Sequence, residues 1–225
     1  MSVSDDQRPA MGILPLGTAN DFATACGIPK SPLEAMKLAL EAEPRPVDII
    51  QANDRYFINV ASAGFGAAIT TEAPVELKNF LGGGAYTMMG VLKALNFTPY
   101  PGTLVAPNLE LKGEIVVGAV CNGRQAGGGQ VLAPEALIDD GLMDVALVLS
   151  FPLRKLDQVV SEFSNPTESG EFVKYFQTPW MEGGGEEPIP VNLDGEPYSN
   201  PRIRFEVIPK AIRLAVPPTC PCIKT

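Results

Sequence analysis

Two turns in the sequence carry carboxylates that could do chemistry, Asp139-Asp140-Gly141 and Asp194-Gly195-Glu196. The chain contains no histidine, so a general base has to be a carboxylate or, less favourably, a lysine or tyrosine. A carboxylate at a hairpin tip could deprotonate a hydroxyl nucleophile, and adjacent carboxylates in a turn could bind a hard cation together with backbone carbonyls. Asp-Gly is also a common turn sequence, and spacing alone favours that simpler interpretation of both segments.

Two glycine-containing segments have the composition of loops that approach a phosphate. Gly17-Thr18-Ala19-Asn20-Asp21 follows an apolar run, and a helix beginning there would offer unpaired N–H groups to an anion. Gly127-Gly128-Gly129 would let the backbone approach a ligand closely. Neither segment is a GxxxxGK[ST] or GxGxxG motif. Spacing alone favours two simpler alternatives, a helix capped by Thr18 and Asp21 and a flexible hairpin loop.

The composition excludes several functional classes. Apolar residues make up 45% of the 225 residues, enough for a packed core, and the formal net charge of -9 argues against a broad nucleic-acid surface. The absence of histidine excludes Ser-His-Asp and Cys-His catalysis. No apolar run has the length of a membrane span or of a signal-peptide core, so we expect a cytoplasmic protein. The four cysteines lack zinc spacing and are expected to be free thiols.

An opening α/β segment is expected to position the first glycine motif. Met11–Leu16 is predicted to form a buried strand, and Thr18–Cys26 a helix that ends at Gly27. A second helix is predicted to begin at Ser31, because a proline follows it and a glutamate lies three positions on. Its apolar face would extend to Pro44.

From Val47 onward the pattern changes to many short β-like runs with turn residues between them. The runs are VDIIQA, RYFINVA, TLVAPNLEL, GEIVVGAVCN, GLMDVALVLS, EFVKYFQT, PIPVNLDG, RIRFEVI and AIRLAVP. One helix is predicted within Pro152–Phe163. Strands this numerous predict a mainly antiparallel sandwich or barrel, with a boundary to the α/β segment near residue 46.

Taken in order, four segments resemble the diacylglycerol kinase catalytic family, and above all its YegS-like bacterial lipid kinases. They are LGTANDFA, FINVASAGFGAAIT, NGRQAGGGQVLAPEALIDDGLMDV and VNLDGEP. The resemblance implies part of an α/β ATP-binding domain at residues 1–46, a β-sandwich domain at 47–210, and a tail at 211–225 that can pack back on the first domain. It also implies transfer of the γ-phosphate of ATP to a lipid hydroxyl, in a phosphatidylglycerol-like or diacylglycerol-like acceptor.

The resemblance also implies roles for individual residues. Glu196 matches the proton acceptor for the lipid hydroxyl, and Asp194 lies next to it. The nucleotide would lie at four residues of the first motif, Gly17, Thr18, Asn20 and Asp21. The metal ligands would be the carboxylate of Asp140 and the backbone carbonyls of Leu137 and Leu142. The ion implied is Mg²⁺, with Ca²⁺ as the alternative.

One motif of the family is missing from the sequence. The family's first nucleotide element, GGDGT, is absent, and the leader MSVSDDQRPA does not resemble it. We therefore expect a chain truncated at its N-terminus. The loss of the preceding strands should expose apolar surface on Met11–Leu16. Whether this chain binds ATP has to be tested directly. The alternatives are a kinase for sphingoid bases or other lipid alcohols, and a non-catalytic β-rich remnant that binds lipid or protein.

The expected partner is a lipid at a membrane surface, reached by a cytoplasmic protein that is peripheral to the inner membrane. No nucleic acid and no transmembrane segment are expected, and the oligomeric state is left open. Residues 74–97 are a candidate lipid-facing segment, although core packing is the favoured role for most of its apolar side chains.

Overall fold

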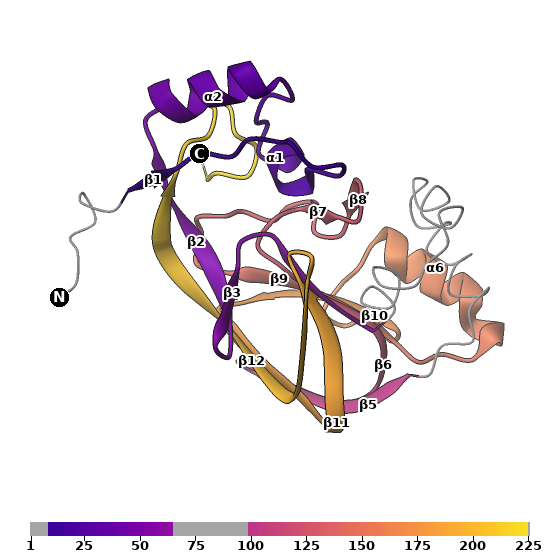
Figure 1. The fold of residues 1–225 in the computed structure, drawn as a ribbon. Helices are drawn as coiled ribbons and strands as arrows, with labels where there is room; N and C mark the ends of the chain where they lie inside the picture. Colours follow the sequence, from indigo (N-terminus) through magenta and orange to yellow (C-terminus); the bar gives the residue numbers. More distant parts are fainter. Residues whose placement is uncertain (1–8, 65–98, 225) are drawn as a thin grey trace.

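A 10-stranded sheet dominates the structure, a computed structural model that describes residues 9–64 and 99–224 (Figure 1). Its strands are β1 (Ala10–Met11), β2 (Arg45–Ala52), β3 (Arg55–Phe57), β4 (Val60–Gly64), β5 (Tyr100–Ala106), β6 (Leu109–Cys121), β9 (Met143–Leu149), β10 (Val173–Thr178), β11 (Trp180–Leu193) and β12 (Glu196–Leu214). Within this sheet the pairing is antiparallel except where β1 pairs with the end of β12. A separate small ladder joins β7 (Gln125–Ala126) to β8 (Gln130–Val131).

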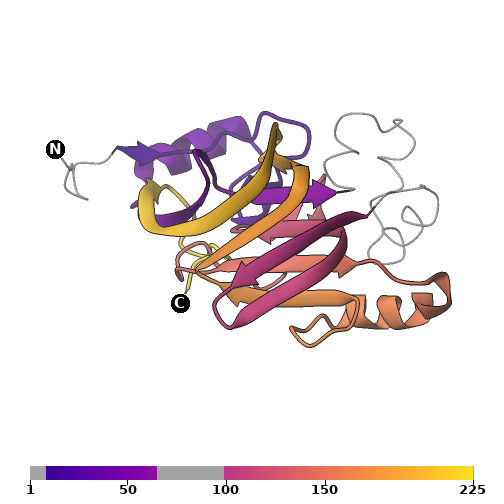
Figure 2. The ribbon, with the colours of Figure 1, turned by 90° about the horizontal axis from the view of Figure 1, so that it is seen from below.

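The helices lie outside the sheet. They are α1 (Asp21–Ala25), α2 (Pro32–Glu41), the 3₁₀ turn η2 (Leu153–Lys155) and α6 (Leu156–Ser164). Figure 2 shows α2 and α6 near opposite ends of the curled sheet. No helix in the described ranges is long and apolar enough to cross a membrane.

Strands β4 and β5 both lie between β6 and β11, but they pair with different stretches of these two long strands. β5 pairs with the first half of β6 and with Glu182–Gly184 of β11. β4 pairs with the second half of β6 and with Val191–Leu193 of β11. The sheet therefore curls round a central apolar core that includes Ile50, Leu104, Met143, Val145 and Phe205.

Two predictions for the opening segment are wrong. Met11–Leu16 is not a strand, because only Ala10 and Met11 pair with β12, and the residues that follow run without a β partner. The first helix begins at Asp21 rather than at Thr18. Asn20 is its N-cap in the left-handed conformation, and its side chain bonds to Gly17, so the predicted cap by Thr18 and Asp21 does not form.

The second helix and most strands lie where the sequence predicts them. Ser31 precedes α2 as its N-cap, with proline at the first helical position. The runs RIRFEVI and AIRLAVP are continuous in β12, because a bulge at Lys210 carries the strand past the expected break. Similarly, RYFINVA divides into β3 and β4 at residues 58–59.

The C-terminal residues pack against the opening segment in a second apolar cluster. Its buried members include Phe22, Cys26, Leu214, Cys220 and Cys222. All four cysteines are buried free thiols, and the thiol of Cys222 contacts the carbonyl oxygen of Ala25 at 3.3 Å. The tail therefore stabilises α1 and the glycine motif that precedes it.

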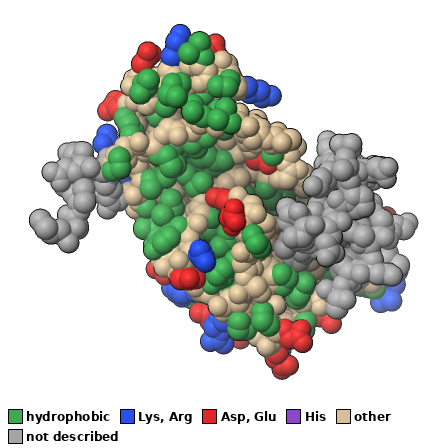
Figure 3. Space-filling view, in the orientation of Figure 1, with side chains coloured by type: hydrophobic (Ala, Val, Ile, Leu, Met, Phe, Trp, Pro, Cys, Tyr) green, Lys and Arg blue, Asp and Glu red, His purple; other side chains and the backbone are tan. Residues whose placement is uncertain are grey.

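Several large apolar side chains of the opening segment remain exposed. Leu16 is 71% exposed, and Leu33 and Leu40 of α2 are 67% and 78% exposed. Figure 3 shows apolar side chains over this end of the molecule. The candidate lipid-facing segment 74–97 lies outside the described residues.

Candidate functional site

The turn between β11 and β12 presents Asp194 and Glu196 in different environments. Asp194 and Gly195 both have positive φ angles, 51° and 104°, and the Gly195 N–H donates to Oδ1 of Asn192 at 2.6 Å. The carboxylate of Asp194 accepts the N–H groups of Ile58, Asn59 and Val60 at 2.7, 3.1 and 2.8 Å. Asp194 therefore fixes the turn to the chain between β3 and β4.

The two acidic side chains are consequently suited to different tasks. Burial of the inward-turned carboxylate raises the pKa of Asp194, and the backbone N–H groups of Ile58, Val60 and Asn59 offset part of this rise. Asp194 and Glu196, the first residue of β12, are both exposed, but the Asp194 carboxylate already accepts three backbone N–H groups. The Glu196 carboxylate is therefore the better suited of the two to meet a substrate that approaches the turn.

The first glycine motif is closed by its own asparagine. The side-chain amide of Asn20 donates to the carbonyl of Gly17 at 2.7 Å, and its Oδ1 accepts the Gly17 N–H at 2.9 Å. Gly17 and Thr18 are exposed on this turn. The turn thus presents Gly17 and Thr18 outward, while Asn20 holds its shape.

Asp21 joins the first glycine motif to the second. Its buried carboxylate accepts the N–H groups of Gly128 and Gly129 at 2.9 and 2.6 Å. Those glycines have φ angles of 86° and 100°, which side chains other than glycine rarely adopt. Two segments more than a hundred positions apart therefore form one loop pair, which the sequence did not reveal.

Two asparagines connect this loop pair to the Asp194 turn. The backbone carbonyl of Asn59 accepts the N–H groups of Asn122 and Gly123, each at 2.9 Å. The side-chain amide of Asn59 donates to the carbonyl of Gln125 at 3.1 Å. Because the Asn59 N–H also bonds to Asp194, a continuous chain of hydrogen bonds links the turn to Asp21. Figure 1 shows the β11–β12 turn pointing toward β7.

Asp48 ties the second acidic turn into the same network. It is fully buried in β2, and its two carboxylate oxygens accept the N–H groups of Gly141 and Lys210, each at 2.7 Å. The fully buried Asn122 donates from its amide to the carbonyl of Asp48 at 3.2 Å. No individual role was predicted for Asp48, Asn59 or Asn122, although Asn59 and Asn122 lie in segments that carry the family resemblance. For Asp48, a lone carboxylate in an apolar strand was the available signal.

Replacement of Asp48 by asparagine is expected to destabilise the fold. An amide keeps one acceptor but directs its own N–H groups at a backbone N–H, so we expect a loss of about 2–4 kcal/mol. Urea denaturation followed by circular dichroism measures it. Asp54→Asn is the matched control, because the Asp54 side chain is 75% exposed, and its change should stay within about 0.5 kcal/mol. Equal stability of both variants would contradict a clamping role for Asp48.

The predicted metal ligands lie together on residues 137–142. Oδ1 of Asp140 accepts the Leu142 N–H at 3.0 Å, so this carboxylate lies over its own turn. Burial raises the pKa of Asp140, and the neighbouring carboxylates of Asp48 and Asp139 add to the rise. A bound cation would relieve that repulsion, and carboxylate and carbonyl oxygens are the ligands that Mg²⁺ and Ca²⁺ prefer. The residues therefore fit a hard divalent cation.

Side chains alone do not form a metal cluster here. In the ranges that the structure describes, no group of three or more Cys, Asp or Glu side chains is arranged to hold an ion. An ion at Asp140 would thus depend on the backbone carbonyls of Leu137 and Leu142 and on water or substrate oxygens.

Known proteins match this chain over nearly its whole length. Residues 59–216 match the family described as "YegS C-terminal NAD kinase beta sandwich-like domain", and residues 2–52 match the "Diacylglycerol kinase catalytic domain". The chain is 52% identical to the "Probable lipid kinase YegS-like" of Shewanella frigidimarina, over 97% of this chain and 71% of that protein. It is 50% identical to the protein of the same name from Chromohalobacter salexigens, over 96% of this chain and 70% of that protein.

A solved structure confirms the architecture. The crystal structure of a diacylglycerol kinase from Bacillus anthracis has a TM-score of 0.70 to this chain at 21% identity, over 95% of this chain and 69% of that one. The fold and the matched families define a kinase of the diacylglycerol kinase class. Within that class, the chain belongs to the YegS-like lipid kinases. The predicted family and the predicted fold class, an α/β segment before a mainly antiparallel β-sandwich, are confirmed.

Proposed function

We propose that the chain transfers the γ-phosphate of ATP to the hydroxyl of a phosphatidylglycerol-like or diacylglycerol-like lipid. The observation that supports this proposal is the hydrogen-bond network that joins the four motif segments. It runs from Asp194 through Asn59 to the second glycine loop, and from there to Asp21. Segments that lie far apart in the sequence are thus joined to the turn that carries Asp194 and the exposed Glu196.

Glu196 accepts the proton of the lipid hydroxyl in this proposal. Phosphoryl transfer needs positioned groups and neutralised charge more than covalent catalysis, so one carboxylate base near the acceptor is sufficient. Asp194 acts as a positioning residue, because its carboxylate is occupied by the N–H groups of residues 58–60.

The nucleotide phosphates lie against the first glycine motif. Gly17 and Thr18 are exposed there and supply a flexible backbone and a hydroxyl donor. Asn20 and Asp21 act indirectly, since their side chains already bond to Gly17 and to the glycines of the second loop. Their part is to hold both loops in the shape that receives the phosphates.

Asp140 and the carbonyls of Leu137 and Leu142 would hold Mg²⁺, or Ca²⁺ as the alternative. When bound, such an ion offsets the negative charge of the transferring phosphate. Asp48 keeps this segment in place through the Gly141 N–H. A lipid acceptor also implies that the protein works at a membrane surface, as a cytoplasmic protein peripheral to the inner membrane.

Transfer of labelled phosphate from ATP to lipid tests the proposal. The chain is incubated with γ-labelled ATP, Mg²⁺ and mixed micelles that contain phosphatidylglycerol, diacylglycerol or a sphingoid base. We expect Mg²⁺-dependent labelling of a glycerol lipid. Labelling of the sphingoid base alone would assign the alternative acceptor. A lack of labelling together with no ATP binding by calorimetry would overturn the proposal for this chain.

A further inference from the structure

Three of the four cysteines meet where the C-terminal tail packs against α1. Cys26 is the C-cap of α1, and Cys220 and Cys222 lie in the tail (Figure 1). Each is a buried member of the second apolar cluster, and the thiols of Cys26 and Cys222 both hydrogen-bond to the sulfur of Cys220. The fourth cysteine, Cys121, lies apart from them in β6. Side chains that are far apart in the sequence therefore form one thiol cluster.

A guanidinium group is held beside this thiol cluster. Nη2 of Arg124 donates to the carbonyl of Pro221, the residue between the two tail cysteines, at 2.6 Å. Its Nε donates to the carbonyl of Ala136 at 2.9 Å, so two bonds fix the position of the cation. A neighbouring cation favours the thiolate form of a cysteine, and the thiolate is the form that acts as a nucleophile.

The three thiols are consequently unequal. Hydrogen bonds from the thiols of Cys222 and Cys26 lower the pKa of Cys220, although burial of this sulfur opposes them. The Cys222 N–H and the charge of Arg124 lower it further. The bonds to Cys220 raise the pKa of Cys26 and that of Cys222, because each of these thiols donates its proton. The cluster thus contains one thiolate, that of Cys220, and two thiols that stabilise it.

Cys220 is the member of the thiol cluster that solvent can reach. It is 8% exposed, whereas Cys26 and Cys222 are 0% exposed. Its neighbours Thr219 and Pro221 are exposed, so the sulfur lies just beneath the surface of the tail. A low-pKa thiolate that a small oxidant can reach, next to a second thiol, is the arrangement of redox-sensitive cysteines.

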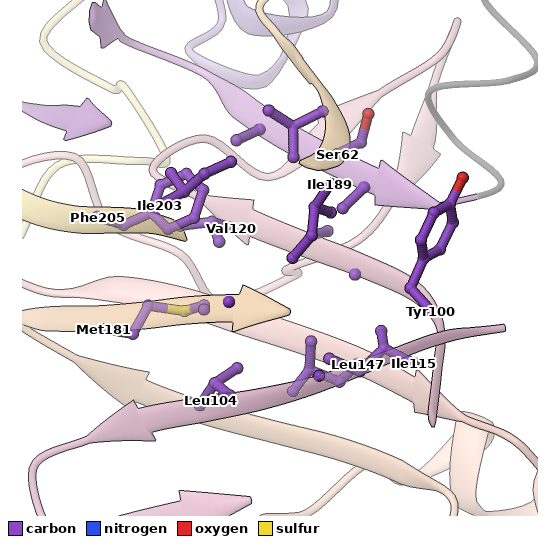
Figure 4. A pocket seen from close by; sticks show the side chains of 18 of the residues that line it. Ser62, Tyr100, Leu104, Ile115, Val120, Leu147, Met181, Ile189, Ile203 and Phe205 are labelled. Carbon is purple, nitrogen blue, oxygen red and sulfur yellow. The ribbon is translucent and has the colours of Figure 1, made fainter. Parts of the chain in front are cut away.

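The apolar cavity inside the curled sheet is a separate feature (Figure 4). It has a volume of about 70 Å³, and residues of the central core such as Leu104, Met181 and Phe205 line it. No cysteine is among its described lining residues. An oxidant therefore reaches the thiols through the surface of the tail and not through this cavity.

Cys26 is a better partner than Cys222 for an oxidised Cys220. A single proline separates Cys220 from Cys222, and its fixed φ restricts the small ring that a bond between them would close. The Cys222 thiol also donates to the carbonyl of Ala25 at 3.3 Å. Cys26 belongs to a different element and already hydrogen-bonds to Cys220. A disulfide between Cys26 and Cys220 requires no such ring.

We propose that the thiol cluster is an oxidation site that a hydroperoxide converts into a Cys26–Cys220 disulfide. The Cys220 thiolate attacks the hydroperoxide, so that an S–O bond forms, the O–O bond breaks, and the departing oxygen takes a proton and leaves as an alcohol or water. The Cys26 sulfur loses its proton and attacks the Cys220 sulfenic acid. The S–S bond forms, and the hydroxide that leaves takes up a proton to become water. The two sulfurs lose two electrons, and the hydroperoxide gains them.

This inference is independent of the proposed function, because neither ATP nor lipid takes part. The bond would join α1 covalently to the tail that packs on it. Because α1 also carries Asp21, the bond would anchor the helix whose first residue holds the second glycine loop.

Peptide mapping after peroxide treatment tests the proposal. The reduced chain is treated with hydrogen peroxide, its remaining thiols are blocked with N-ethylmaleimide, and it is digested with trypsin. We expect a cross-link between peptides 1–30 and 214–224 that a reductant releases, while Cys121 is alkylated. A bond between Cys220 and Cys222, which lies within peptide 214–224, would overturn the proposal. Alkylation of all four thiols after the treatment would do so too.

Two serine variants identify the tail cysteine that takes part. Cys220→Ser should remove the cross-link and slow the loss of thiols by about tenfold or more, because it removes the thiolate. Cys222→Ser is the matched control and should keep the cross-link, since a serine hydroxyl can still donate to the carbonyl of Ala25. Loss of the cross-link in Cys222→Ser, or its persistence in Cys220→Ser, would overturn the proposal. If Cys220→Ser fails to fold, Cys222→Ser decides the question, because Cys220 is then the only cysteine of the tail.

Discussion

Replacement of Glu196 by alanine is expected to abolish lipid phosphorylation while the fold stays intact. Loss of a general base typically slows a reaction by about 10²–10⁴-fold, so labelled lipid should fall below detection. The Glu196 side chain is exposed at the start of β12, and its removal should leave the melting temperature unchanged. The measurement pairs initial rates of phosphate transfer with thermal unfolding of the same preparation.

The control for this variant is a second exposed carboxylate on the same hairpin. Glu187 lies in β11 near its bulge, far along the strand from the Asp194 turn, and Glu187→Ala should keep normal turnover. Near-normal turnover of Glu196→Ala would refute the assignment of the base. An equal loss in both variants would indicate that general acidity of the hairpin, rather than Glu196, is required.

The motif segments could be identified from the sequence because each has a local signature. Gly17, Gly127-Gly128-Gly129 and Asp194-Gly195 are residues that turns require, and turn chemistry is set by neighbouring positions. Likewise, alternating β-branched and aromatic runs indicated most of the strands. These features could be inferred without knowing which strands pair.

The contacts that join the motifs could not be predicted in the same way. Asp21 bonds to Gly128 over 107 positions, and Asp194 bonds to Asn59 over 135. Such partners depend on the register of β4, β6 and β11, which no short pattern specifies. As a result the sequence suggested that Asp21 caps its own helix, whereas in the structure its carboxylate accepts hydrogen bonds from Gly128 and Gly129 in a distant loop.

The error at Met11–Leu16 has a related cause. An apolar run is necessary for a buried strand but does not provide a partner strand. Only Met11 of this run, with Ala10 just before it, pairs with β12. Ile13 and Leu14 instead pack against the cluster that contains the C-terminal tail. Their hydrophobicity therefore serves side-chain packing without a β ladder.

Replacement of Asp194 by alanine is expected to reduce both stability and turnover, in contrast to Glu196→Ala. The backbone N–H groups of residues 58–60 would lose their shared acceptor, at a cost of about 2–4 kcal/mol after allowing for their partial exposure to water. The turn would then no longer be fixed against β4, so Glu196 would lose its position. Urea unfolding and phosphate-transfer rates measure the two effects.

The conservative variant Asp194→Asn separates positioning from direct catalysis. Its amide oxygen can still accept N–H groups at one of the two carboxylate positions, while its NH₂ group faces a backbone N–H at the other, so some stability is lost. A positioning residue should nevertheless retain a measurable part of kcat and an unchanged shape of the pH profile. A group that takes the substrate proton would lose that function completely when it becomes an amide. Full stability of Asp194→Ala combined with complete inactivity of Asp194→Asn would therefore transfer the base from Glu196 to Asp194. Retained activity in Asp194→Asn would instead support a division of labour, in which Asp194 holds the turn and Glu196 acts on the lipid hydroxyl.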